Sequence, residues 1–235
     1  MIQFYAPDIE SSLTLPEGES QHCVRVLRSC VGDTIEVIDG RGHRFACRLV
    51  DPHPKHAAVE IIDRTDVPLP WDTHITLAVA PTKNIDRMEW MVEKLTEIGV
   101  NRIIPLRCRY SERKEIKTER LEKIAISAMK QSLKAVLPEI LPMTPFANAI
   151  EMCRPESGRY IAYCDEAIPR KLFTHEYRRS TDAFILIGPE GDFSKDEITA
   201  ALNAGFSPVS LGDNRLRTET AAIVACDTCH ILDSL

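Results

Sequence analysis

The sequence predicts an α/β fold that follows a small β-rich N-terminal domain. From residue 75 onward, short apolar runs typical of buried strands alternate with amphipathic helical patterns. Before that point, three short segments rich in β-branched residues are separated by Gly, Asp and Pro. The stretch 65–73 contains two prolines and makes a plausible linker. We therefore expect two domains within the 235 residues, at 1–68 and at 72–235.

The N-terminal domain is expected to be a small β-barrel. The segments DTIEVIDG (33–40), HRFACRLV (43–50) and AAVEIID (57–63) have the length and composition of short strands. The turn residues between them allow tight connections. These features favour a mostly β structure over the first 65 residues.

The second domain begins with the apolar run ITLAVA (75–80) and a helical pattern at 84–99, which Gly99 ends. In the helix at 194–205, Ser194 and Glu197 have the spacing of a capping box. The remaining predicted elements are strands at 101–106, 160–164, 183–188 and 208–212 and a helix at 118–133. Alternation of this kind predicts a mostly parallel sheet covered on both faces.

Composition narrows the class of protein. No apolar run is long enough to cross a membrane, and the N-terminus MIQFYAPDIE lacks the features of a signal peptide. We therefore expect a cytoplasmic protein. The eight cysteines are scattered, and the one close pair, Cys226 and Cys229, lies in an apolar helical pattern. This pair predicts buried thiols and no metal site.

The net charge of −6 argues against a uniformly basic nucleic-acid binder, but the charge is uneven. Residues 105–134 hold nine Lys/Arg against four Glu, so this segment carries +5 and the remaining chain −11. Such a segment is either a solvated helix face or a local phosphate-binding surface. Charge alone favours the solvated face.

Ligands of parallel α/β sheets bind where strands run into helices. Three segments have this position: 81–83, GPEGDFS (188–194) and GDNRLRTET (212–220). Gly188 and Gly191 permit close backbone approach, but the P-loop and GxGxxG patterns are missing. The chain is therefore neither a nucleoside triphosphatase of the P-loop type nor a typical dinucleotide-binding protein.

The RLRTET segment begins a helix. Thr218 or Thr220 is expected to cap it, and Glu219 complements the helix dipole. Arg215 and Arg217 are unexplained, because cations near a helix N-terminus are electrostatically unfavourable. They imply an anionic ligand or an intersubunit partner.

IGPEGDFSKDEI followed by LGDNRLRTETAA resembles the paired signature of the bacterial 16S rRNA uridine-N3 methyltransferases (RsmE), which belong to the SPOUT class. HCVRVLR (22–28), the run at 83–100, SERKEIK and SAMKQS extend the resemblance over nearly the whole chain. One departure is Asp192, where family members often have Gly or Pro. An acid just ahead of a helix is easily tolerated.

The resemblance implies a PUA-like β-barrel for RNA binding and a SPOUT-type α/β domain with a C-terminal trefoil knot. It also implies a homodimer, with S-adenosyl-L-methionine bound near the subunit interface. Because methylation at N3 removes a proton and leaves a uridine anion, we expect Arg217, supported by Arg215, to stabilise that anion, with Glu190 or Glu219 as a weaker choice of base. The cofactor residues carried over are Leu186, Gly188, Glu190, Gly191, Leu211, Gly212, Leu216, Thr218, Thr220 and Ala221.

The implied substrate is 16S rRNA, expected in the assembled 30S subunit. The residues expected to contact RNA phosphates are Arg25, Arg28, Lys83, Arg87, Arg113, Lys114 and Lys117. Two alternatives remain: a methyltransferase of the same class acting on another RNA such as tRNA, and a ribosome-assembly factor without catalysis.

Overall fold

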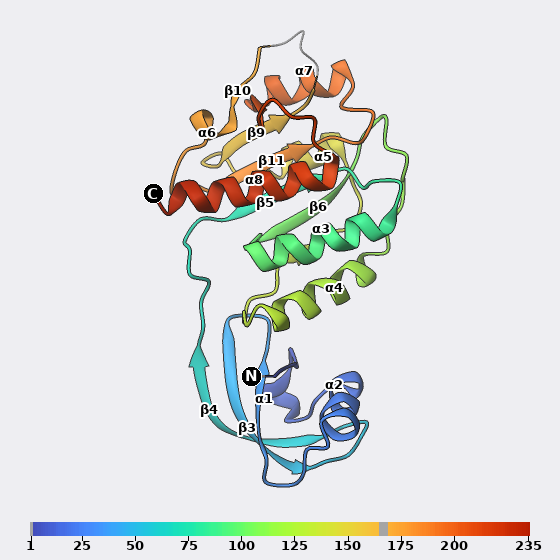
Figure 1. Ribbon diagram of the computed structural model, residues 1–235, viewed down its shortest axis with the longest axis vertical. Coiled ribbons are helices and arrows are strands. Elements are labelled where there is room, and N and C mark those ends of the chain that lie inside the picture. Colours follow the sequence, from blue (N-terminus) through green and yellow to red (C-terminus); the bar gives the residue numbers. More distant parts are fainter. Residues whose placement is uncertain (1, 165–168) are drawn as a thin grey trace. The chain divides into compact units, whose positions relative to one another are not determined.

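The computed structural model describes residues 2–164 and 169–235, which form two compact units (Figure 1). The first unit contains the chain up to Trp71 together with Ile126–Leu137, and the second contains Asp72–Ala125 and Pro138–Leu235. The sequence-based division assigned residues 126–137 to the α/β domain, whereas here they cluster with the first unit. Backbone hydrogen bonds from Gly42 N to Ala135 O (2.9 Å) and from Leu137 N to Gly40 O (2.9 Å) explain this placement.

A four-stranded sheet in the order β1-β2-β3-β4 forms the first unit. Its strands are β1 (Gln3–Tyr5), β2 (Thr34–Ile38), β3 (His43–Asp51) and β4 (Ala58–Asp66). The three predicted strands are confirmed. Register shifts at Ala46/Cys47 and Leu49/Asp51 mark irregularities in the β3–β4 pairing, and both strands curve strongly in Figure 1.

The first unit also contains helices that the sequence pattern did not predict. They are α1 (Ile9–Ser12), α2 (Glu17–Gln21) and the π-helix η1 (His22–Val26), which lie between β1 and β2 in the chain. The expectation of mostly β structure was wrong for this stretch. Helix α1 is too short to show a helical repeat, and the continuous stretch 17–26 changes from α to π geometry, which disturbs the 3.6-residue repeat.

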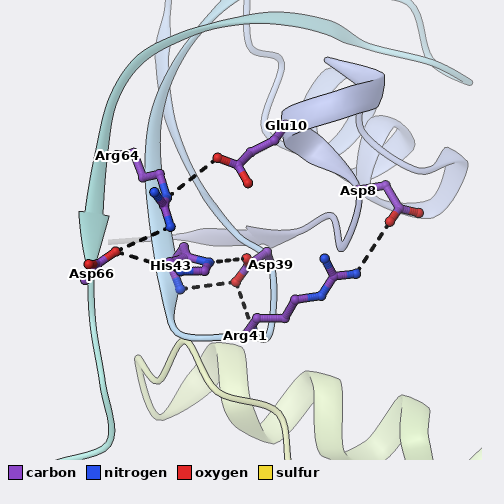
Figure 2. A network of polar contacts seen from close by, with 7 residues as sticks. All are labelled: Asp8, Glu10, Asp39, Arg41, His43, Arg64 and Asp66. Atoms are coloured by element: carbon purple, nitrogen blue, oxygen red, sulfur yellow. Dashed lines mark hydrogen bonds and ion pairs between the residues drawn. The ribbon is translucent and has the colours of Figure 1, made fainter.

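Figure 2 shows a polar network around the turn between β2 and β3. The buried carboxylate of Asp39 accepts a hydrogen bond from the backbone N–H of Arg41 (2.8 Å) and lies 2.6 Å from His43 Nδ1. Burial by itself raises the pKa of Asp39, but the hydrogen bonds from His43 and Arg41 outweigh it and lower the pKa. His43 and Arg64 both contact Asp66 on β4, so the network joins the turn to the neighbouring strand.

The second unit is built on a parallel sheet in the order β10-β12-β9-β11-β5-β6-β7, with β8 paired to β6. Its strands are β5 (Ile75–Val79), β6 (Arg102–Arg107), β7 (Glu139–Ile140), β8 (Thr144–Pro145), β9 (Gly158–Ala162), β10 (Lys171–Leu172), β11 (Ala183–Ile187) and β12 (Ser207–Ser210). Its helices are α3 (Ile85–Ile98), α5 (Phe146–Glu151), α6 (Phe173–Glu176), α7 (Lys195–Asn203) and α8 (Thr218–Asp233). Helix α4 (Thr118–Gln131) begins in this unit and ends in the first.

Helices cover both faces of the parallel sheet, as predicted. On one face, Phe146 and Ala149 of α5 and Ile198 of α7 pack against Ala78 and Leu186 of the strands. On the other face, α3 and α8 lie side by side and contact each other, and α8 also contacts β5 and β11 (Figure 1). The sheet is therefore buried on both sides.

The predicted ends of the helices are largely confirmed. Ser194 and Glu197 form the capping box at the start of α7, and Gly99, with φ of 134°, ends α3. Cys226 and Cys229 on α8 are fully buried, and burial raises the pKa of both thiols. No helix in the described ranges has the length and apolar character needed to cross a membrane.

Candidate active site

A cavity of about 840 Å³ lies at the C-terminal ends of β9, β11 and β12, in the second unit. It is lined by residues 162–164, 187–190 and 209–219, together with Arg87, Arg170, Asp192 and Ala221. Its size falls within the range of small-molecule sites. Two of the three segments predicted to carry chemistry, those after β11 and β12, therefore meet at one place.

The loop after β11 is held rigid by its own polar groups. The Asp192 carboxylate accepts hydrogen bonds from the backbone N–H groups of Cys164 and Phe193, each at 2.8 Å. Glu190 Oε1 accepts one from the backbone N–H of Lys83 at 3.1 Å. A Cβ at Gly188 would lie 3.1 Å from the Phe193 ring, so a larger residue is disfavoured there. The loop thus has one well-defined backbone path.

Asp192 has a φ of 64°, in the left-handed region that favours glycine. This conformation explains why glycine suits the position, and the two hydrogen bonds of the carboxylate explain how aspartate is accommodated. The sequence-based expectation that the acid is tolerated rested only on the helix dipole. Its main role in the structure is to fasten the loop to the end of β9.

The segment after β12 leads through Gly212, with φ of 119°, to the start of α8. The N-cap of α8 is Arg217, and its side chain makes no capping hydrogen bond. The prediction of Thr218 or Thr220 as the cap is therefore wrong. Instead, the buried Thr218 hydroxyl donates to the carbonyl of Gly188 at 3.0 Å, which ties the two loops together.

Arg215 and Arg217 are exposed and line the cavity. Within the described part of the chain, neither guanidinium forms an ion pair or a hydrogen bond. The positive charge at the start of α8 is thus uncompensated, as the sequence suggested. Two exposed cations at a cavity make it chemically suited to an anion or a developing negative charge.

Glu219 lies in the first turn of α8 and is only 5% exposed, although it lines the cavity. Arg87, from α3, approaches it with 3.7 Å between Arg87 Nη1 and Glu219 Oε1. The sequence predicted Arg87 as an RNA contact and did not connect it with Glu219. The two lie 132 positions apart, so only the side-by-side packing of α3 and α8 reveals the pair.

Three of the predicted cofactor residues lie outside the cavity lining. Leu186 is fully buried in the core between the sheet and α7, and Thr220 on α8 does not line the cavity. A Cβ at Gly191 would lie 3.2 Å from Cβ of Tyr110, so this glycine permits close packing. The other seven predicted residues line the cavity: Gly188, Glu190, Leu211, Gly212, Leu216, Thr218 and Ala221.

The sequence missed the contribution of β9. Ala162, Tyr163 and Cys164, at the end of this strand, line the cavity together with Arg170. Nothing local marks them as functional. The signal was positional, because a strand that neighbours both β11 and β12 ends at the same edge of the sheet.

The residues predicted to contact RNA divide into two groups. Arg25 and Arg28 in the first unit and Lys83, Lys114 and Lys117 in the second are exposed, whereas Arg87 and Arg113 have partners inside the protein. Arg113 donates to the carbonyl oxygens of Thr82 (3.2 Å) and Lys83 (2.7 Å).

The basic segment at 105–134 is partly neutralised in the structure. Arg109 pairs with Asp196, Arg120 with Glu89, and Lys130 with Glu19. A fraction of its charge therefore serves internal ion pairs.

Comparison with known proteins identifies the class. Residues 69–230 match the model of the RNA methyltransferase domain, and residues 15–62 match the RNA methyltransferase PUA domain. The ribosomal RNA small subunit methyltransferase E of Aquifex aeolicus is 31% identical, over 94% of this chain and 95% of that protein. The protein of the same name from Rickettsia conorii is 30% identical, over 95% and 91%.

Solved structures indicate the same class of protein. A probable rRNA-methyltransferase from Porphyromonas gingivalis is 48% identical, with a TM-score of 0.95, covering 100% of this chain and 99% of that one. The ribosomal RNA small subunit methyltransferase E from Neisseria gonorrhoeae, bound to S-adenosyl methionine, is 30% identical, with a TM-score of 0.85 and coverage of 99% and 98%. The chain therefore belongs to the family of PUA-containing RNA methyltransferases that includes the ribosomal RNA small subunit methyltransferases E.

Proposed function

We propose that this protein transfers a methyl group from S-adenosyl-L-methionine to N3 of one uridine in 16S rRNA. The observation that carries the proposal is the cavity where the GPEG loop and the RLRTET segment meet at the ends of parallel strands. Relatives that share the whole length of the chain are named as methyltransferases of the small-subunit rRNA. With the ribosome as its substrate, we expect the protein to act in the cytoplasm.

The cavity suits S-adenosyl-L-methionine in size and in chemistry. Leu211, Leu216 and Ala221 offer apolar surface to an adenine ring, and the strand-end glycines Gly188 and Gly212 leave backbone groups accessible. When bound, this cofactor supplies a methyl group on a positively charged sulfur. In the proposal, Leu186, Gly191 and Thr220 support the residues that contact it.

Arg217 and Arg215 are proposed as catalytic residues. Methylation at N3 requires loss of the N3 proton, and the uracil ring then gains negative charge. An exposed guanidinium without a partner among the described residues is available to stabilise that charge. Glu190 has a different role in the proposal: its bond to the Lys83 backbone fixes the cofactor loop.

RNA binding is proposed to involve both units. The first unit matches a PUA domain and exposes Arg25 and Arg28, and the second exposes Lys83, Lys114 and Lys117. Contacts of these cations with phosphates would position the RNA without reading its sequence. We propose the assembled 30S subunit as the natural form of the substrate.

A trefoil knot and a homodimer complete the proposal. The Thr218–Gly188 hydrogen bond holds the start of α8 against the loop after β11, an arrangement compatible with the proposed knot. Trp90 on α3 and Ile231 on α8 are 46% and 52% exposed, which supports a second copy covering this helical face. A monomeric mass in light scattering at micromolar concentration would contradict the dimer.

The test is methyl transfer from labelled S-adenosyl-L-methionine to three substrates: 30S subunits, free 16S rRNA and tRNA. Label on N3 of one 16S rRNA uridine is the expected result. Label on tRNA would mean another RNA substrate. Binding of 30S subunits without transfer of label would mean an assembly factor.

A further inference from the structure

One buried carboxylate oxygen at the cavity has no hydrogen-bond partner among the residues that the structure describes. It is Oε2 of Glu219, a residue that is 5% exposed and lines the cavity. The other oxygen, Oε1, lies 3.7 Å from Arg87, the charged group that the described structure places against it. A buried carboxylate oxygen without a donor is costly. A ligand that donates a hydrogen bond to Oε2 would remove this cost.

Glu190 lines the same cavity but differs from Glu219 in its exposure and in its hydrogen bonding. Its side chain is exposed, and one of its oxygens already accepts the backbone N–H of Lys83. A carboxylate in water competes poorly for a ligand proton, whereas one shielded from water interacts more strongly. Glu219 is therefore better placed than Glu190 to interact with the reacting base.

The pair of Glu219 and Arg87 complements one edge of uracil. That edge presents the O4 acceptor, the N3–H donor and the O2 acceptor, and a flipped base is read along this edge. Glu219 offers an acceptor, and Arg87 beside it offers donors. Cytosine has an amino group in place of O4 and no proton at N3, so the same pair would oppose it.

We propose that Glu219 accepts the N3 proton of the target uridine while Arg87 contacts a neighbouring carbonyl oxygen of the base. The inference rests on the proposed function and assigns its base. The N3–H bond breaks and the proton passes to the Glu219 carboxylate. The electron pair left on N3 forms the bond to the methyl carbon, and the carbon–sulfur bond breaks with its electrons remaining on sulfur. The Glu219 carboxyl then releases its proton to water.

The test compares Glu219→Gln with the wild-type chain in single-turnover methylation of 30S subunits across a range of pH. Glutamine keeps the shape and removes the proton acceptor, so we expect a rate about 10²–10⁴-fold lower. The Glu219→Gln rate should keep rising at alkaline pH, where N3 of uridine ionises without a protein base, and Glu219→Asp should recover part of the lost rate. The dissociation constant for S-adenosyl-L-methionine and the melting temperature should stay near wild-type values. Glu151→Gln, exposed on α5 and outside the cavity, is the matched control.

A second variant, Arg87→Met, distinguishes two roles of Glu219: accepting the N3 proton, or only positioning Arg87. Arg87→Met should slow the reaction but keep the pH profile of the wild-type chain. If Arg87→Met changes that profile as Glu219→Gln does, Glu219 acts through Arg87 and the proposal is wrong.

Other outcomes would also overturn it. These are a Glu219→Gln rate within about threefold of wild type, loss of S-adenosyl-L-methionine binding, or unfolding that aspartate does not rescue. If the wild-type chain methylates none of the RNAs, the proposed function itself fails.

Discussion

The two loops that meet at the cavity differ in how their charged side chains are satisfied. In the loop after β11, the carboxylates of Glu190 and Asp192 both accept backbone N–H groups, and Glu197 of α7 accepts one from Ser194 at the end of the loop. In the segment after β12, Arg215 and Arg217 have no such partner within the described structure. The loop after β11 is therefore ordered without a ligand, whereas the arginines after β12 keep their charge available for a ligand. A site needs both properties, because fixed geometry and available charge are separate contributions to catalysis.

Among the changes that test this comparison of the two loops, removing a charge from the segment after β12 should have the largest effect on activity. Arg217→Ala is expected to lower methyl transfer by about 10²–10³-fold, as for loss of one group that stabilises an anion. Stability should stay level or rise by about 0.3–1 kcal/mol, because a cation is removed from a helix N-terminus. Single-turnover rates and thermal unfolding measure both. Near-normal turnover would remove Arg217 from the catalytic proposal.

Removing the hydrogen bonds that hold the loop after β11 should mainly lower the stability of the protein. Asp192→Ala loses two hydrogen bonds to a carboxylate, so we expect a loss of about 1–3 kcal/mol in unfolding free energy. Asp192→Gly is the control, since glycine adopts a φ of 64° without strain. Denaturant titration measures the two. Equal stability of Asp192→Ala and wild type would mean that the loop is held elsewhere.

The capping box at α7 provides a smaller test on the same loop. Ser194→Ala removes the side-chain acceptor for Glu197 N and should cost about 1 kcal/mol. The rate of methyl transfer should change little at a temperature where the chain is folded. A large loss of rate with unchanged melting temperature would place Ser194 in the site itself.

The exposed lysines should have the smallest individual effects. Lys114→Ala and Lys117→Ala should each reduce the salt dependence of RNA affinity by a slope of about 1, if each contacts one phosphate. Lys130→Ala is the comparison, because that cation pairs with Glu19. Affinities at several salt concentrations give the slopes. A binding affinity that does not vary with salt would contradict phosphate contacts.

Local signals in the sequence predicted much of the fold. The apolar runs predicted β5 and β11, and the Ser194–Glu197 spacing predicted the start of α7, because each depends on residues close in the chain. The short helices before β2 left no repeat to detect. Thr218 was misread as a cap because its partner, Gly188, lies 30 residues earlier.

In the candidate site too, only features that depend on residues close in the chain could be predicted. Arg215 and Arg217 stood out because their charge conflicts with the local helix, a conflict visible in six consecutive residues. The pairing of Arg87 with Glu219 and the contribution of Tyr163 depend on which elements are neighbours in space. The sequence identified charged residues whose local structure does not explain them, and the arrangement of strands and helices identified their neighbours.

The parallel pairing of β5 with β11 also bears on how the second unit folds. These neighbours are joined across a long stretch of chain: the backbone N–H of His74, just before β5, bonds to Asp182, 108 residues later. Contacts of such separation form slowly, because a large loop must close before they give any stability. The cavity requires β9, β11 and β12 together, so it is absent from any intermediate made of the early strands alone. A ligand of this cavity therefore stabilises the finished unit and gives no guidance to the first steps of folding.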